Sequence, residues 1–586
     1  MLGKIIEIKD NKVILLPQID LYNIENLIGK NVIFKSKTNV IVGEVVSFIN
    51  NNIEIILIGE IVNNKFIYGD INKPPLNSTC DLITKNELDI ILSNNSDNYI
   101  TVGKSFIYND YEIKIDVNNF FSNHFAILGN SGSGKSCSVA KIIQSIFYDY
   151  KDLPFRTNIF LFDAYGEYQT AFNNIGAKNS NLNYKVFTTD LHAKNVELLR
   201  IPFWLLTLDD LCLLLNVSNQ LQIPIIEKAL KLVGYFAQEE DKVIKQKNDI
   251  IARCLLNIIY GGEKPIEIRN KITSTLSKFY TKDINLNLNL TKGGWTRTIR
   301  QCIYVDGAGK MADVEVVISY LESLISDDFE LSMPNGEIQY TIEDFYKALE
   351  FALISEGSLS NNKVYEYGNI LTIRLNSLIN SDYVNYFRFN SYVNRPEYIK
   401  WLLLCSNGRK AQIINFNINY VDDRMAKVIV KIYSKLLFDY ITRLEKRASF
   451  PVHIVLEEAH RYILNDTDVE ILGYNIFERI SKEGRKYGMI LGVISQRPSE
   501  ISQTVLSQCS NFLVFKIFHP LDLKIVKDII ASSSDILTEK IKTLHPGTCI
   551  MFGTAFKMPI IASLYLPNPM PLSENCNISD TWYIKS

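Results

Sequence analysis

A glycine-rich octapeptide, placed between an apolar run and an amphipathic segment, constrains this fold more than any other feature. It comprises Gly129, Asn130, Ser131, Gly132, Ser133, Gly134, Lys135 and Ser136, and Cys137 follows it. Residues 125–128 predict a buried strand before it, and residues 137–143 predict a helix after it. In this context the glycines let backbone N–H groups turn toward a phosphate at the helix N-terminus. We predict that residues 129–137 form a nucleotide-binding P-loop, with an ordinary glycine-rich turn as the alternative.

The predicted P-loop implies ATP and Mg²⁺ as cofactors. Lys135 would reach the β- and γ-phosphates, and the Ser136 hydroxyl would ligate the Mg²⁺ ion. Residues 158–163 predict a parallel strand that ends in Asp163, with Glu167 four residues further on. Carboxylates at the carboxyl ends of such strands lie beside the ligand crevice, so we assign Asp163 to the metal side and Glu167 to the catalytic side. A solvated strand end is the other interpretation.

Two further strand ends supply candidate catalytic groups. Residues 452–456 are apolar and precede the paired acids Glu457 and Glu458, which is the Walker B arrangement. We assign Glu457 to Mg²⁺, and Glu458 to the base that orients and deprotonates the attacking water. Neighbouring residues of a continuing strand point to opposite sides, so the two roles should differ. His460 is predicted to be structural, whereas Gln496, after another apolar strand, is predicted to hydrogen-bond the γ-phosphate or the water.

Arg485 lies on the short connection that precedes this last strand. From there it could reach the nucleotide of a neighbouring subunit as an arginine finger, a contact worth roughly 10³–10⁵ in rate in GTPases. A solvated surface arginine is an equally good interpretation of the residues alone.

The chain divides into five predicted regions. Residues 1–95 contain short alternating segments separated by Asn, Asp, Gly and Pro, which predict a small antiparallel β-barrel. We favour docking or oligomerisation over nucleic-acid binding for this barrel, because its charge is mixed. The other regions are the first part of the nucleotide-binding core (96–200), a helical insertion (201–400), the second part of the core (401–562) and a C-terminal extension (563–586).

Three short segments carry separate expectations. Residues 107–108 are predicted to form a strand. The segment Lys292-Gly293-Gly294-Trp295-Thr296-Arg297 either grips a nucleic-acid strand or, as we favour, is a surface turn with one buried Trp. The Pro-rich residues 567–571 are predicted to be irregular, and either to fray or to lie across a partner subunit.

Composition excludes several classes of protein. The formal net charge is −2, which excludes coating of nucleic acid by bulk charge, so any DNA contact must be local. The nine cysteines are scattered without a CxxC pair, which argues against a disulfide scaffold and a structural zinc site. The amino terminus lacks a signal-peptide core, and the longest apolar runs are far shorter than a membrane span. We predict a cytoplasmic protein without a membrane segment.

Five motifs together resemble the HerA branch of the FtsK–HerA superfamily of ring-shaped DNA-pumping ATPases. In chain order they are His124-Phe125-Ala126-Ile127-Leu128-Gly129, Asp163-Ala164-Tyr165-Gly166-Glu167-Tyr168, Leu456-Glu457-Glu458-Ala459-His460, Glu483-Gly484-Arg485-Lys486-Tyr487-Gly488 and Ser495-Gln496-Arg497-Pro498-Ser499. The resemblance covers nearly the whole chain and implies an α/β fold with a RecA-like P-loop ATPase core, an N-terminal small β-barrel and a helical insertion. Ala164 stands where the family often has Pro, and Glu457 where many P-loop enzymes have Asp. Because a carboxylate is kept, hydrolysis should persist.

The resemblance also implies partners. It implies a homohexamer with ATP at the subunit interfaces, double-stranded DNA in the pore and Arg485 as the finger in trans. HerA-like ATPases are similar in working beside a second protein. This is a NurA-type nuclease in archaeal DNA end resection, and a nuclease or sirtuin-like effector in bacterial anti-phage defence. The Asn-, Ile- and Lys-rich sequence suggests an AT-rich bacterial genome and so favours the defence setting.

The sequence therefore predicts a hexameric ATP-hydrolysing DNA translocase or helicase that works with a nuclease or another effector, in anti-phage defence or DNA end processing. The alternative is an ATP-gated hexameric scaffold that assembles and regulates the effector enzyme. A P-loop kinase or metabolite-transferring enzyme is disfavoured, because the sequence resembles neither a lid nor a small-molecule pocket motif.

Overall fold

The computed structural model describes residues 1–19, 27–35, 40–69, 72–92, 98–108, 110–148, 153–177, 179–334, 336, 338–357, 362–464, 468–530, 535–572 and 578–582. The chain forms two compact units. The first consists of Met1–Glu197, Leu402–Asp466 and Asn475–Ser586, and the second of Leu198–Trp401 and Thr467–Tyr474.

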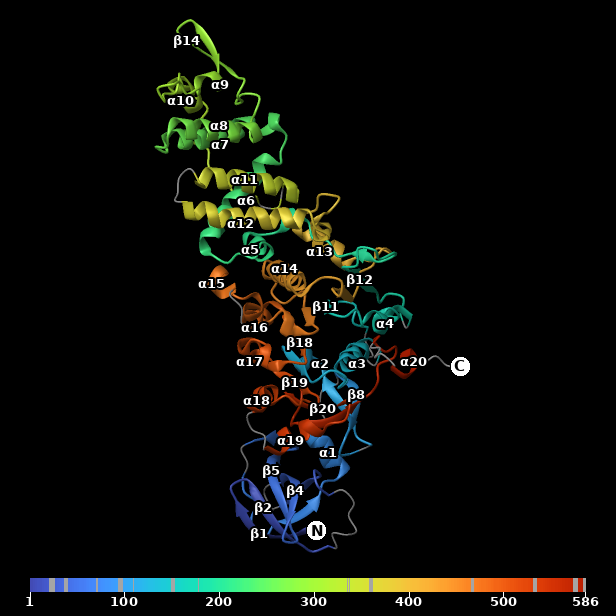
Figure 1. Ribbon diagram of the computed structural model, residues 1–586. Helices are drawn as coiled ribbons and strands as arrows, with labels where there is room; N and C mark the ends of the chain where they lie inside the picture. Colours follow the sequence, from blue (N-terminus) through green and yellow to red (C-terminus); the bar gives the residue numbers. More distant parts are fainter. Residues whose placement is uncertain are drawn as a thin grey trace. The chain divides into compact units, whose positions relative to one another are not determined.

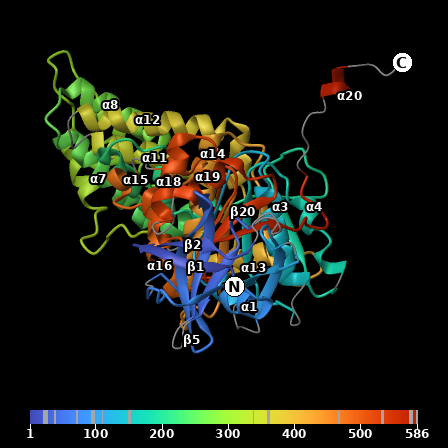
Figure 2. The ribbon, with the colours of Figure 1, turned by 90° about the horizontal axis from the view of Figure 1, so that it is seen from below.

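The first unit begins with a closed antiparallel barrel, which confirms the predicted barrel fold (Figures 1 and 2). Its strands follow the order β2-β1-β7-β3-β4-β5, and β5 pairs with β2 to close the ring, while β6 pairs outside it. Every second side chain along these strands points into the barrel and forms its interior. Between β2 and β5, Val13 pairs with Ile55 and Leu15 pairs with Ile53, and all four side chains are fully buried. The strands are β1 (Gly3–Lys9), β2 (Lys12–Pro17), β3 (Asn31–Lys35), β4 (Val40–Ile49), β5 (Asn52–Val62), β6 (Lys65–Tyr68) and β7 (Thr79–Leu82), and α1 (Lys85–Leu92) follows.

A mixed sheet forms the rest of the first unit, with the order β13-β12-β16-β11-β17-β18-β10-β19-β20-β21-β8-β9. From β12 to β19 the neighbouring strands run parallel, and most of their residues are apolar and buried. The strands are β8 (Tyr99–Ser105), β9 (Glu112–Asp116), β10 (Phe125–Leu128), β11 (Ile159–Asp163), β12 (Tyr184–Thr188), β13 (Glu197–Leu198), β16 (Ile413–Asn417), β17 (Val452–Leu456), β18 (Met489–Ser495), β19 (Asn511–Val514), β20 (Thr548–Gly553) and β21 (Ile560–Leu564). This parallel sheet, with the P-loop strand inside it, confirms the predicted RecA-like α/β core.

Helices cover the sheet. The P-loop helix α3 contributes Val139, Ile143 and Phe147 to the core cluster that also holds β10 and β11 residues, and α14 packs beside α16. The helices of this unit after α1 are α2 (Val117–Phe121), α3 (Lys135–Tyr148), α4 (Gln169–Phe172), α14 (Asp423–Thr442), α16 (Ile476–Tyr487), α17 (Gln503–Gln508), α18 (Pro520–Ile529), α19 (Asp535–Thr543) and α20 (Ile578–Trp582).

The predicted strand at residues 107–108 is wrong, because these residues form a bend after β8. The Ser105 hydroxyl accepts hydrogen bonds from the N–H groups of Ile107 and Tyr108, at 3.3 and 3.1 Å. A side chain that captures the backbone in this way turns the chain out of the ladder.

The second unit is mainly helical. Its helices are α5 (Leu208–Leu214), α6 (Ile223–Phe236), α7 (Glu240–Tyr260), α8 (Pro265–Lys278), α9 (Ile299–Cys302), α10 (Val314–Glu322), α11 (Ile342–Gly357), α12 (Asn362–Ile379), α13 (Arg395–Leu403) and α15 (Asp468–Leu472). Helices α6, α11 and α12 lie side by side in Figure 1, in agreement with the contacts of α11 with both neighbours.

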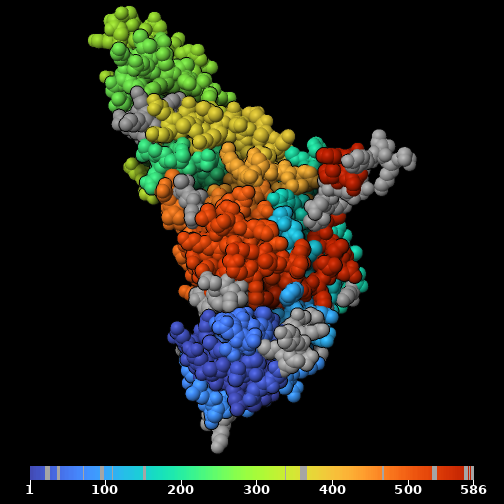
Figure 3. All heavy atoms as spheres, turned by 60° about the horizontal axis from the view of Figure 1, so that its bottom comes forward, coloured from blue at the N-terminus to red at the C-terminus, as the bar shows by residue number. Residues whose placement is uncertain are grey.

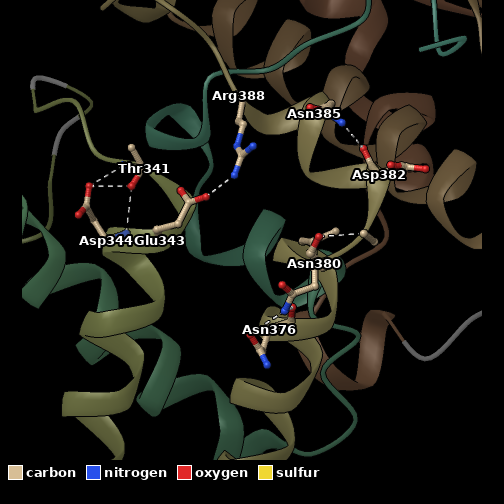
Figure 4. A network of polar contacts seen from close by, with 10 residues as sticks. Thr341, Glu343, Asp344, Asn376, Asn380, Asp382, Asn385 and Arg388 are labelled. Atoms are coloured by element: carbon tan, nitrogen blue, oxygen red, sulfur yellow. Dashed lines mark hydrogen bonds and ion pairs between the residues drawn. The ribbon is translucent and has the colours of Figure 1, made fainter. Parts of the chain in front are cut away.

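Polar contacts fix the start of α11 (Figure 4). The backbone N–H and the hydroxyl of Thr341 both donate to the Asp344 carboxylate, at 3.0 and 2.8 Å, which caps the first turn. Glu343 in the same turn forms an ion pair with Arg388. The helix N-terminus is thereby tied to the segment that follows residues 382–387.

A two-stranded hairpin replaces the turn that the sequence suggested at residues 292–297. Strand β14 (Asn289–Lys292) pairs with β15 (Trp295–Thr298), and Gly293 and Gly294 join them with φ values of 55° and 90°. Both positive φ angles suit the tight turn that matches strand twist. Trp295 is half-buried beneath the Arg297 guanidinium, 4.9 Å from the ring centroid, and Arg297 is also paired with Asp313. The aromatic and the cation are therefore engaged within the hairpin region itself.

Candidate nucleotide-hydrolysis site

Four parallel strands carry the predicted site residues at one edge of the sheet. The P-loop follows β10, Asp163 ends β11, Glu457 follows β17 and Gln496 follows β18. Strand β18 lies between the P-loop strand and the Walker B strand, and pairs in parallel with both. Because parallel strands end at the same edge, residues more than 300 positions apart in the chain meet there.

The P-loop glycines are required by its backbone. Gly132 and Gly134 have φ values of 71° and 105°, which side chains rarely adopt. A Cβ atom on Gly129 would lie 2.5 Å from the Cβ of Phe515, so this position leaves no room for a side chain. At Gly132 nothing lies within 4 Å of such an atom, and the loop is open there. The loop has the glycine-lined shape that a phosphate cradle needs.

Lys135 is a buried cation at the start of α3. Its Nζ donates to the Asn130 carbonyl at 2.9 Å. Burial lowers the pKa of Lys135, and the charges of Glu458, Glu457 and Glu167 act in the opposite direction. The ammonium group therefore lies next to the loop and within the field of all three acids.

Asp163 folds the loop that carries Glu167. Its Oδ1 accepts from the N–H groups of Gly166 and Glu167, at 2.7 and 3.0 Å. Its Oδ2 accepts from the Tyr168 N–H and from Asn415 Nδ2, at 3.0 and 3.2 Å. The fully buried carboxylate thus organises the backbone of the loop, and its assignment to the metal stays a prediction.

Glu167 lies beside the P-loop helix. Its carboxylate is half-buried. Burial raises the pKa of Glu167, the Ser136 side chain acts against this, and the Asp163 charge raises it further. The predicted metal ligand Ser136 and the predicted catalytic acid Glu167 are therefore neighbours.

Glu457 is buried at the end of β17. Its Oε2 accepts a hydrogen bond from the Ala164 N–H at 3.1 Å. Burial raises the pKa of Glu457 well above its usual range, and the nearby Asp163 and Glu167 charges add to this. A cation strongly stabilises the ionised form of a carboxylate that lies among other acids. The position of Glu457 therefore suits the predicted metal role.

Glu458 leaves the strand in an unusual conformation. The strand β17 ends at Leu456, and Glu458 has φ 49° and ψ 47°, in the left-handed region that non-glycine residues rarely occupy. Its buried Oε2 lies 3.2 Å from Nδ1 of His460, and among the described residues it accepts no hydrogen bond. The alternation expected for a continuing strand does not apply to the two acids, because the strand ends before them. His460 also approaches the Ser495 hydroxyl at 3.1 Å, as a structural residue would.

The fold does not bring Arg485 to this cluster. Arg485 is exposed in the last turn of α16, four residues before β18 begins, whereas Gln496 directly follows the other end of β18. Burial lowers the pKa of His124, just before β10, to about 4, and the charge of Arg485 adds to this effect. Arg485 therefore lies at the amino ends of the strands, and its role in a neighbouring copy stays a prediction.

Sequence reasoning missed Asn415 as a site residue. It lies in β16 and is the side-chain donor to Asp163. A polar residue inside the apolar run Ile413-Ile414-Asn415-Phe416 was the available signal, because buried amides need partners.

The residues present fit ATP and Mg²⁺: the open glycine loop and Lys135 suit phosphates, while Ser136 and Glu457 suit the ion. Within the described ranges, His, Cys, Asp and Glu side chains form no group of three or more that could hold a metal ion. In the same part of the chain, no helix has the length and apolar character needed to cross a membrane.

Comparisons with known proteins show what the chain is similar to. Residues 100–325 match the family described as the central domain of the helicase HerA. The DNA double-strand break repair helicase HerA of Pyrococcus furiosus is 22% identical over 511 residues, which cover 87% of this chain and 76% of the relative. The probable HerA of Methanocaldococcus jannaschii is also 22% identical, over 95% of this chain and 94% of its own.

Among solved structures, VirB4 of Thermoanaerobacter pseudethanolicus aligns with a TM-score of 0.41 and 12% identity, over 80% of this chain and 97% of that one. The prediction of an ATPase agrees with relatives named as helicases, and ATP and Mg²⁺ as cofactors stay a prediction. Residues 100–325 match the HerA central domain, and over most of its length the chain is similar to proteins named as HerA helicases.

Proposed function

We propose that this chain is a DNA-translocating ATPase that works as a homohexameric ring, with each ATP site completed by the neighbouring copy. The observation that carries the proposal is the division of the catalytic groups. Lys135, Glu167, Glu457 and Glu458 share one edge of the sheet, whereas Arg485 lies near His124 at the other. A site that lacks its arginine within one chain is suited to completion in trans. Relatives named as DNA double-strand break repair helicases support DNA as the substrate.

The side chains have distinct tasks in this proposal. P-loop N–H groups and Lys135 hold the phosphates, and Ser136 and Glu457 hold Mg²⁺, which screens phosphate charge when bound. Glu458 Oε2 orients the attacking water and takes its proton, because no described residue donates a hydrogen bond to that atom. Gln496 hydrogen-bonds the water or the γ-phosphate. Asp163 holds the backbone that places Glu167 beside Ser136.

Double-stranded DNA should stimulate ATP hydrolysis several-fold at low salt, and the stimulation should fade as salt rises, because phosphate contacts release counterions. The measurement is the steady-state hydrolysis rate against DNA concentration at two salt concentrations. Active protein that neither binds DNA nor responds to it at low salt would contradict the translocase.

A second role, docking of an effector protein, is favoured by the outer face of the barrel. Ile6, Leu16, Phe48 and Ile49 are between 41 and 53% exposed. They lie on β1, β2 and β4, and β2 and β4 both pair with β5. Exposed apolar side chains on neighbouring parts of one barrel sheet are typical of a protein interface. We propose that this face binds a nuclease or sirtuin-like effector, in anti-phage defence or DNA end processing, as a ring scaffold would.

Leu16→Glu should weaken binding of the effector encoded beside this chain about tenfold or more, since it places a charge in an apolar contact. Basal ATP hydrolysis should be unchanged. Ile67→Glu on β6, which pairs outside the closed ring, is the matched control. Equal binding by wild type and Leu16→Glu, measured by titration, would refute this docking face.

A further inference from the structure

A short C-terminal segment runs over two elements of the nucleotide site. We call residues 567–572 the strap; in Figures 1 and 3 the red chain that leads toward α20 passes beside the region of α3 and α4. The Thr170 hydroxyl donates to the Met570 carbonyl at 2.9 Å, and the Leu572 N–H donates to the Glu167 carbonyl at 2.8 Å. The Pro-rich stretch is irregular, as predicted, and it lies on its own chain.

Gln144 is the centre of this arrangement. It lies on α3 and is 2% exposed. Its Nε2 donates to the carbonyls of Ala171 and Pro569, at 2.9 and 2.8 Å, and its Oε1 accepts from the Asn568 N–H at 2.8 Å. One buried amide therefore joins the P-loop helix, α4 and the strap.

Helix α3 contacts residues 163–172 at two positions along its length. At the start of the helix, the Ser136 side chain is close enough to Glu167 to lower the pKa of its carboxyl group. Eight residues later, roughly 12 Å along the axis, Gln144 bonds the Ala171 carbonyl. The strap contacts the same segment from a third direction at Glu167 and Thr170. The backbone segment that carries Glu167 is therefore held by contacts with α3, with Asp163 and with the strap.

We propose that Gln144 and the strap are positioning residues for ATP hydrolysis, which hold Glu167 in register with Ser136. The inference rests on the role proposed for Glu167, and it assigns to the C-terminal residues a task inside the ATPase site. The strap touches neither the P-loop glycines nor Lys135 in any described contact, so it should affect the chemical step more than nucleotide binding. Small displacements of a catalytic group can cost up to about 10²-fold in rate.

The test uses the full chain and two independent substitutions. Gln144→Met keeps the side-chain length and removes all three hydrogen bonds. Leu572→Pro removes the N–H group that bonds the Glu167 carbonyl, at an exposed position of the strap. Each should lower kcat for basal ATP hydrolysis about tenfold, with the KM for ATP and the Kd of an ATP analogue changed less than about twofold. The double variant should be less impaired than the product of the two single effects, since both act through the strap.

Matched controls separate positioning from general damage. Leu572→Ala keeps the backbone N–H and should be several-fold milder than Leu572→Pro. Gln503→Met, at an exposed glutamine of α17, should leave kcat unchanged. If Gln144→Met does not fold, Leu572→Pro decides the matter alone. The inference would be overturned if a folded Leu572→Pro variant had the wild-type kcat. It would also be overturned if the only change were a higher KM for ATP. Hydrolysis that DNA fails to stimulate would instead count against the translocase only.

Discussion

Glu458→Gln should abolish most ATP hydrolysis, with a decrease in kcat of about 10²–10⁴-fold, while ATP binding is kept. Glutamine has the size of the native side chain but cannot take a proton from water. The affected atom is buried and, among described residues, accepts no hydrogen bond, so the contact that the substitution changes is the approach of His460 Nδ1 at 3.2 Å. Steady-state hydrolysis and equilibrium binding of an ATP analogue are the two measurements.

Glu315→Gln on the exposed face of α10 is the control, and it should hydrolyse ATP at the wild-type rate. A Glu458→Gln protein that retains more than about a tenth of wild-type kcat would show that another group serves as base. The left-handed backbone at Glu458 makes the comparison with Glu458→Ala useful as well. That variant removes the carboxylate at the same strained position.

Lys135→Ala should remove both ATP binding and hydrolysis, which distinguishes it from the Glu458 variant. The ammonium is the buried cation of the P-loop and the partner of the Asn130 carbonyl. Without it, the phosphates would face three acids with no compensating charge. We expect the affinity for ATP to fall about 10²-fold or more, as measured by titration with a fluorescent analogue. Lys310→Ala, at an exposed lysine of the second unit, is the matched control.

The Lys135→Ala protein also tests completion of the site in trans. Arg485→Ala should be inactive by itself, but it keeps an intact P-loop. In rings mixed at equal amounts, about a quarter of the interfaces would pair an intact P-loop with an intact Arg485 from the neighbour. Hydrolysis should therefore recover to roughly a quarter of the wild-type rate if interfaces act independently. No recovery in rings shown to be mixed would contradict the arginine finger.

Local patterns predicted much of this molecule. The glycine-rich octapeptide, the acids after β11 and β17 and the short strands of the barrel depend on neighbouring residues, and side-chain periodicity reveals them. The same reasoning failed at Ile107 and Tyr108, because the Ser105 hydroxyl captures their N–H groups. The alternation expected for a continuing strand does not reach Glu458, since β17 ends at Leu456 and Glu458 adopts a left-handed conformation.

By itself, the sequence determined that this protein has a P-loop, paired acids and a HerA-like order of motifs, because each of these is written in a few consecutive residues. Only the tertiary structure decided which strands are neighbours, and so which acids meet Lys135. It also decided that Asn415 serves Asp163, that Arg485 lies at the other edge, and that Gln144 joins α3 to the strap. These facts depend on contacts between residues far apart in the chain, whose partners a linear pattern does not specify.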